Sequence, residues 1–275
     1  MAGQRTEGHT PSSLILTFFG AYGRAECAGR VAVAALIRLL GAADVDPQSV
    51  RSAVSRLKRR GLLVADQTAV YRLSADATEM LADGDRRIYR DASAPAEGGW
   101  VLVVFSVPET ERHKRHLLRS RLSRLGFGTA APGVWIAPAH LHQEARHTLE
   151  RLGLGSYVDL FHGSHTGFTP TREAVRRWWD LDALAALHRA FLAEQEPVLT
   201  AWARRSSVRR PKDAFRDYLR ALDSWRRLPY ADPGLPAELL PGDWPGGRAA
   251  QVFGELHERL REPGAEFVRA VHRMT

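Results

Sequence analysis

The chain has 275 residues, of which 44% are hydrophobic and 25% are charged. This composition is typical of a folded globular protein, excludes extensive disorder, and leaves room for two or three domains. The formal net charge of +8 favours a polyanionic partner, because Lys and Arg that neutralise phosphates release counterions. An arginine-rich composition that simply reflects a GC-rich genome would give the same excess.

The single cysteine, Cys27, excludes an internal disulfide and any cysteine-based zinc site. The first residues lack the apolar core of a signal peptide. No stretch approaches the ~20 apolar residues that span a bilayer. We therefore expect a soluble cytoplasmic protein that makes no membrane contact and needs no cofactor.

Two helices are predicted near the N-terminus. Residues 12–22 have the apolar spacing of a helix, with Ser12 or Ser13 as the N-cap. Residues 33–40 are predicted to form a second short helix that ends at Gly41.

A third helix is predicted over residues 46–60, with Asp46 as its cap, Pro47 at the tolerated first position and Gly61 ending it. Its apolar residues recur at helical spacing and are expected to face a core: Val50, Ala53, Val54 and Leu57.

The opposite face of this helix presents side chains that can bond base edges and phosphates, and none of them is a carboxylate, although the chain has 31 Asp and Glu residues. We predict DNA contacts for Gln48, Ser49, Arg51, Ser52, Ser55, Arg56, Lys58, Arg59 and Arg60. The alternative is a three-helix bundle whose basic helix is merely solvated.

A hairpin is predicted directly after this helix. Residues 62–66 and 69–73 are expected to pair as two strands, with Gln67 and Thr68 in the turn between them. A hairpin that follows a helix-turn-helix is a wing, and Gln67, Thr68 and Arg72 are therefore predicted to reach a phosphate or the adjacent minor groove.

The middle of the chain is predicted to form a small α+β domain with a ferredoxin-like sheet. It follows a polar linker at residues 91–99. Strand, helix, strand, helix and strand are expected in that order: residues 100–107, 109–126, 133–137, 141–152 and 156–162.

From Thr169 onward the apolar spacing is mostly helical. A Pro- and Gly-rich passage, residues 228–247, interrupts it before a last helix near residues 248–260. The predicted fold class is thus α+β and multidomain. A winged helix-turn-helix domain would comprise residues 1–90, an α+β domain that serves dimerisation residues 91–168, and a mostly helical domain residues 169–275.

Three stretches of the sequence carry a family resemblance: SLILTFFGAYGR, VAVAALIRLLGAADVDPQSVRSAVSRLKRRGLLVAD and LPYADPGLPAELLPGDWPGG. They resemble the phenylacetic-acid-degradation repressor family, the PaaX-like regulators, over nearly the whole chain. The resemblance implies a winged helix-turn-helix, a central Cas2-like domain and a helical C-terminal domain. It also implies a bacterial repressor that binds an imperfect inverted repeat as a homodimer and is released by an aryl acyl-CoA such as phenylacetyl-CoA.

Members of this family control several pathways, so the identity of the effector is left open. A pocket for an aryl-acyl group needs an apolar, aromatic lining, and Trp178, Trp179 and Trp202 are the candidates for it. The alternative is that they belong to a core. The basic segments 111–124 and 204–212 are either solvated surfaces or contacts to the phosphates of DNA or CoA.

An enzyme is not expected. Cas2-type nucleases carry a metal-binding aspartate at the end of the first strand, whereas this strand ends in FSVP and Glu109 lies beyond it, where it suits a helix N-terminus. The histidine pairs 113/116, 140/142 and 162/165 are expected to lie on the surface without a metal. A non-specific nucleic-acid-binding protein and a metal-dependent nuclease remain the alternatives to a regulator.

Overall fold

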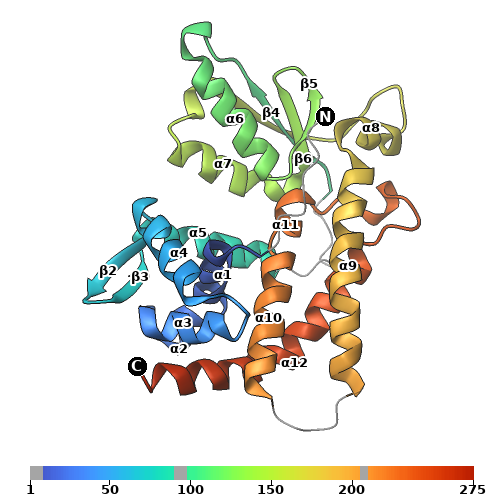
Figure 1. The fold of residues 1–275 in the computed structure, drawn as a ribbon. Helices are drawn as coiled ribbons and strands as arrows, with labels where there is room; N and C mark the ends of the chain where they lie inside the picture. Colours follow the sequence, from blue (N-terminus) through green and yellow to red (C-terminus); the bar gives the residue numbers. More distant parts are fainter. Residues whose placement is uncertain (1–8, 90–97, 205–209) are drawn as a thin grey trace. The chain divides into compact units, whose positions relative to one another are not determined.

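The computed structural model describes residues 9–89, 98–204 and 210–275 (Figure 1). Contacts between residues divide the chain into two compact units. Unit 1 is drawn from residues 1–90, 191–226 and 248–275, and unit 2 from residues 91–190 and 227–247. Most of the predicted linker, residues 91–97, lies outside the described residues.

The N-terminal helices of unit 1 begin with α1 (Pro11–Phe18), which continues as a π-helical turn (Phe19–Gly23) and the short α2 (Arg24–Glu26). The prediction that Ser12 or Ser13 caps this helix is wrong. Thr10 is the N-cap, because Pro11 occupies the first helical position, and the Thr10 hydroxyl accepts a hydrogen bond from the Ser13 amide at 3.1 Å.

The next two helices are α3 (Val33–Gly41) and α4 (Pro47–Arg59). Gly41 lies inside α3 instead of after it, and Ala42 is the C-cap. The prediction for α4 is confirmed: the Asp46 carboxylate accepts a hydrogen bond from the Ser49 amide at 2.9 Å. Gly61 follows the helix with a φ of 70°, a left-handed conformation that costs glycine little.

A small antiparallel sheet completes the N-terminal part of unit 1. The predicted hairpin consists of β2 (Leu63–Gln67) and β3 (Val70–Leu73). A third strand that the sequence did not predict, β1 (Arg30–Ala32), pairs with β3, so the order is β1-β3-β2. The hairpin turn consists of Thr68 and Ala69, whereas Gln67 is the last residue of β2 and does not lie in the turn as predicted. The helix α5 (Ala75–Ile88) follows.

Helices from the C-terminal half supply the rest of unit 1. They are the last part of α9 (Leu181–Arg204), α10 (Pro211–Trp225) and most of α12 (Gly246–His272). The prediction that the last helix ends near residue 260 is wrong, because α12 continues through Pro263. Gly264 lies so close to the Tyr22 hydroxyl and the backbone of Phe215 that a β-carbon at this position would collide with both.

The sheet of unit 2 has four antiparallel strands in the order β5-β6-β4-β7, with two helices in the connections. This is the strand order of a ferredoxin-like domain. The elements are β4 (Trp100–Phe105), α6 (Arg112–Arg124), β5 (Gly128–Ala131), β6 (Val134–Pro138), α7 (His142–Arg151) and β7 (Val158–Gly163). The sequence predicted three of the strands and missed β5.

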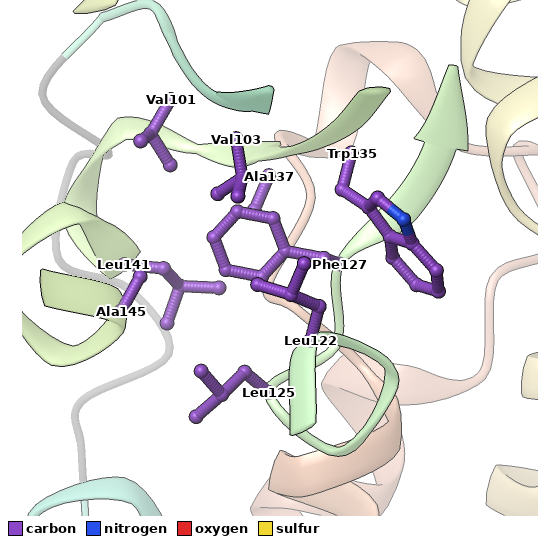
Figure 2. Packing of buried hydrophobic residues seen from close by; sticks show 9 residues of the cluster. All are labelled: Val101, Val103, Leu122, Leu125, Phe127, Trp135, Ala137, Leu141 and Ala145. Carbon is purple, nitrogen blue, oxygen red and sulfur yellow. The ribbon is translucent and has the colours of Figure 1, made fainter. Parts of the chain in front are cut away.

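The core of this domain lies between the sheet and its two helices. Figure 2 shows side chains from β4 and β6, such as Val103 and Trp135, facing Leu122 and Leu125 at the end of α6. Short 3-10 turns (Glu109–Glu111, Ala139–Leu141, Gly155–Tyr157 and Ala237–Leu239) and the helices α8 (Thr171–Trp178) and α11 (Leu228–Ala231) complete unit 2.

The α+β multidomain class is therefore confirmed, with N-terminal helices and a small sheet, a ferredoxin-like α+β domain and a helical C-terminal region. The two compact units do not follow the three linear segments predicted as domains, and those boundaries stay a prediction. Within the described part of the chain, no helix is both long and apolar enough to cross a bilayer.

Candidate DNA-binding interface

The helix α4 is divided sharply into a buried face and an exposed face. The buried face consists of Val50, Ala53, Val54 and Leu57, of which Val54 is 3% exposed and the others are fully buried. This face packs against α1 and α3. The position of α4 is thus fixed by apolar contacts on one side only, which leaves the other side available for a partner.

The exposed face carries the residues predicted to contact DNA. Most are exposed, and Ser49 and Ser52 are half-buried. Within the described residues, the guanidinium groups of Arg51, Arg56 and Arg59 make no ion pair. They therefore keep their hydrogen-bond donors for an external acceptor, and the guanidinium fork matches a guanine edge or a phosphate.

A carboxylate stands at the start of α4, on its cap, Asp46. A hydrogen bond between its side chain and Ser49 lowers the pKa of this carboxyl group below its ordinary value. Asp46 is therefore committed to the end of the helix, where it stabilises the unpaired amides of the first turn. The carboxylate-free face of α4 begins only after it.

The hairpin places the other predicted DNA contacts in the same unit. Gln67 and Thr68 are exposed at its tip. Arg72 is exposed on β3, and its Nε lies 3.5 Å from the Asp66 carboxylate, which partly neutralises its charge. The Nε of Arg30 on β1 lies 3.2 Å from the same carboxylate.

Arg30 is a cation of this surface that sequence reasoning missed. In the sheet it lies directly opposite Arg72, and its side chain is 60% exposed. The only signal for it would have been the pairing of β1 with β3, which joins residues about 40 positions apart and is not visible in local spacing.

The three tryptophans predicted to bind an effector are not brought together in one unit. Trp178 and Trp179 belong to unit 2 and pack against Trp100, with ring centroids 5.4 and 6.0 Å away. Trp179 is 7% exposed, and its ring nitrogen donates to the Gly126 carbonyl oxygen at 2.8 Å. Trp202 belongs to unit 1 and donates to Asp217 at 2.8 Å. Their role in effector binding stays a prediction.

The first basic segment, residues 111–124, consists of α6 and its N-cap, Glu111. Its cations are partly paired: Lys114 contacts Glu111 and the Tyr157 hydroxyl at 2.7 and 2.6 Å, and Arg115 lies 3.0 Å from Glu109. A shallow hollow of about 350 Å³ on this helix is lined by Glu109, Arg112, Arg115, His116 and Arg119. In the second segment, residues 205–209 lie outside the described residues, and the Arg210 guanidinium lies 3.6 Å from Asp213.

The sheet of unit 2 offers little for a nuclease. β4 ends at Phe105, and Asp159 lies on the neighbouring strand β7 opposite Val104. Among residues 9–89, 98–204 and 210–275, no group of three or more His, Cys, Asp or Glu side chains lies close enough to hold a metal ion.

Models of three parts of one protein family match this chain. A PaaX-like protein model matches residues 10–77, the PaaX protein central Cas2-like domain residues 93–175, and the PaaX-like protein C-terminal domain residues 179–270. The chain belongs to the PaaX-like family. The three matches follow one another in the order that the sequence motifs predicted.

This PaaX-like chain is also similar to a curated repressor and to a solved structure. The transcriptional repressor PaaX of Escherichia coli (strain K12) is 24% identical over 246 residues, which cover 87% of this chain and 77% of that repressor. The structure of the uncharacterized protein Rv0674 from Mycobacterium tuberculosis covers 94% of this chain, with a TM-score of 0.58 and 19% identity. At that identity the likeness shows the shared fold only.

Proposed function

We propose that this PaaX-like chain is a sequence-specific DNA-binding transcriptional repressor that reads its operator with α4. The observation that carries the proposal is the exposed face of α4, where three arginines that make no ion pair with any described residue lie on a helix that has no carboxylate. The function of the repressor PaaX, a distant relative over most of its length, supports the same conclusion.

In the proposed complex, the N-terminal helices and small sheet act as a winged helix-turn-helix. The helix α4 enters the major groove, where Arg51, Arg56 and Arg59 bond guanine edges or phosphates. The serines and Gln48 orient the helix through phosphates and base edges. The hairpin lies beside the DNA, and Gln67, Thr68 and Arg72 contact the backbone or the minor groove.

We further propose that the protein acts in the cytoplasm as a homodimer, without enzymatic activity, on an imperfect inverted repeat. Two copies of α4 would then enter successive major-groove faces ~34 Å apart. An aryl acyl-CoA such as phenylacetyl-CoA is the proposed effector. It would release the DNA by binding more tightly to a dimer in which the two α4 helices have the wrong spacing.

The experiment that tests this function begins with an operator selected from a random DNA pool by the wild-type protein. Its dissociation constant is then measured for Arg51→Ala, Arg56→Ala and the control Arg146→Ala. We expect Arg56→Ala to weaken operator binding by about fivefold or more, the size of a good base or phosphate contact. Arg146 on α7 pairs with Glu150 at 2.9 Å, and its loss removes the same charge from a helix that is not proposed to contact DNA.

Two outcomes would contradict the proposal. If the wild-type protein binds scrambled DNA as tightly as the selected site at the same salt concentration, binding is non-specific. If Arg51→Ala and Arg56→Ala both bind the operator as tightly as the control, α4 is not the helix that reads DNA.

A further inference from the structure

The helix α10 contacts the N-terminal helices of unit 1 through buried aromatic rings. The ring centroid of Phe215 lies 6.5 Å from that of Phe18 and 5.6 Å from that of Tyr22. Phe18, Tyr22 and Phe215 are all fully buried. Because α1 also packs against α4, it lies between the helix proposed to read DNA and a helix from the C-terminal half of the chain.

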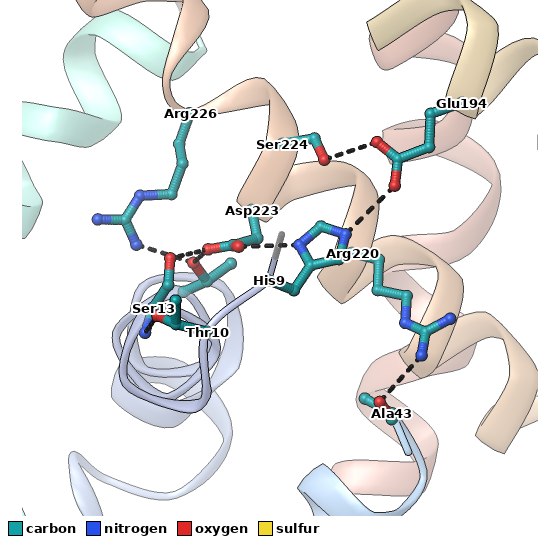
Figure 3. A network of polar contacts seen from close by, with 10 residues as sticks. His9, Thr10, Ser13, Ala43, Glu194, Arg220, Asp223, Ser224 and Arg226 are labelled. Atoms are coloured by element: carbon teal, nitrogen blue, oxygen red, sulfur yellow. Dashed lines mark hydrogen bonds and ion pairs between the residues drawn. The ribbon is translucent and has the colours of Figure 1, made fainter. Parts of the chain in front are cut away.

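A buried carboxylate adds a polar contact between α10 and α1. Asp223 has no exposed surface, and its oxygens accept hydrogen bonds from His9 at 2.9 Å, from Thr17 at 2.7 Å and from Ser13 (Figure 3). Arg226 donates to the Thr17 hydroxyl at 2.8 Å. These bonds, from residues before and along α1, fix α1 on α10 in one register, because any shift would leave Asp223 buried without its partners.

One turn earlier on α10, Arg220 reaches the turn between α3 and α4. Its Nη2 donates to the Ala43 carbonyl oxygen at 3.0 Å (Figure 3). The same nitrogen lies 2.8 Å from a carboxylate oxygen of Asp44. Asp44 has a φ of 62°, a left-handed conformation that is uncommon outside glycine but that Asp and Asn adopt more readily than other residues. Only Val45 separates it from Asp46, the cap of α4.

We infer that α10 sets the position of α4, and that Arg220 is the residue of α10 that does so. The C-terminal helices would then contribute to DNA recognition without touching DNA. This inference rests on the proposed function of α4. The Arg220 guanidinium holds the turn in place through Ala43, and it neutralises Asp44, whose side chain is 73% exposed two residues before the cap of α4. Without Arg220, the Asp44 carboxylate would repel phosphates. The turn would also lose its contacts to α10, namely the bonds from Arg220 to Ala43 and Asp44, which we call the tether.

The test compares Arg220→Ala with Arg216→Ala on the same helix, measured on the selected operator and on scrambled DNA at one salt concentration. Arg216 contacts Asp217 at 2.8 Å and Asp213 at 3.5 Å, both on α10. It also attracts Asp44 through a longer-range Coulomb interaction, so its loss removes the same charge near Asp44 while the hydrogen bond from Arg220 to the turn stays in place. We expect Arg220→Ala, but not Arg216→Ala, to lower the ratio of operator to scrambled-DNA affinity by at least about fivefold, the lower end of a typical coupling between sites.

Two further measurements separate positioning from charge and from stability. In an Asp44→Asn background, which keeps a residue that tolerates the left-handed turn, Arg220→Ala should cost less than it does in the wild type. Amide hydrogen exchange of the free protein should accelerate over residues 43–50 in Arg220→Ala and stay unchanged in Arg216→Ala, with similar unfolding temperatures for the two variants.

A failure of the inference about Arg220 can be told apart from a failure of the proposed function. A wild-type protein that does not discriminate between operator and scrambled DNA overturns that function, while the exchange measurement still tests the tether by itself. If the wild type discriminates and Arg220→Ala does so equally well, or weakens both DNAs by the same factor, the inference is wrong. Unchanged exchange over residues 43–50 also overturns it.

Discussion

Asp223 remains ionised in a fully buried position because three donors surround it. Burial alone would raise the pKa of this carboxyl group, but the hydrogen bonds from His9, Ser13 and Thr17 hold it below its ordinary value. The same contact, together with Glu194, raises the pKa of His9 to about 9. The imidazolium is therefore the stable form in the folded protein at neutral pH.

The pH dependence of stability follows from His9. Its folded pKa of about 9 exceeds the ordinary value of 6.5, so its contribution is complete below pH 6.5 and is lost as the pH rises through 9. His9→Gln should therefore lower the unfolding temperature at pH 6, and the difference from the wild type should shrink to nothing by about pH 10. Thermal unfolding followed by circular dichroism at three pH values checks this.

The control for this prediction is His113→Gln, because His113 is exposed on α6 and makes no ion pair within the described residues. It should show no such change with pH. A His9→Gln protein that is destabilised equally at pH 6 and pH 10 would mean that His9 acts through packing and not through its charge.

Within the helix α4, residues next to each other in the sequence have different roles: one contributes to stability and its neighbour is proposed to contact DNA. Leu57 is fully buried and Arg56 is exposed. We expect Leu57→Ala to cost about 2–5 kcal/mol of unfolding free energy, the range for a cavity left by a leucine. Arg56→Ala should change stability by no more than ~0.5 kcal/mol. Urea denaturation of both variants measures the difference, and a large loss in Arg56→Ala would place its side chain in the core.

The elements that the sequence predicted well are those with local signals. The helix α4 has a cap, a proline at its first position and apolar residues at helical spacing, so its bounds and faces followed directly. β1 and β5 have three and four residues, without an apolar alternation, and depend on partners elsewhere in the chain. The helix α12 passes through Pro263 because packing against Tyr22 and Phe215 outweighs the local preference.

The candidate site was also predictable only where its residues have local signals in the sequence. The exposed residues of α4 could be derived from the spacing of its buried ones. The tether from Arg220 to Asp44 joins positions 176 residues apart, and the contact of Asp223 with His9 spans 214. No local pattern predicts such a pair, because the side chains meet only after α1 and α10 have packed together.

At the scale of the whole molecule, the proposed function requires two copies on one operator and a ligand that removes them. Analytical ultracentrifugation of the protein with operator DNA should show two protomers per DNA duplex. Phenylacetyl-CoA should release the DNA, whereas free CoA at the same concentration should not. A single protomer on the intact operator would contradict the dimer, and retention of the DNA with every aryl acyl-CoA tested would contradict the proposed effector.

The composition of unit 1 from three separate stretches of chain has a consequence for the order of events at the ribosome. Residues 9–89 are synthesised long before α10 and α12, whose Phe215 and Gly264 complete the packing around Phe18 and Tyr22. Until then, the nascent N-terminal helices keep part of their aromatic surface uncovered and open to chaperones. A chain truncated before α10 would retain its arginine face but lack the partners that bury those rings.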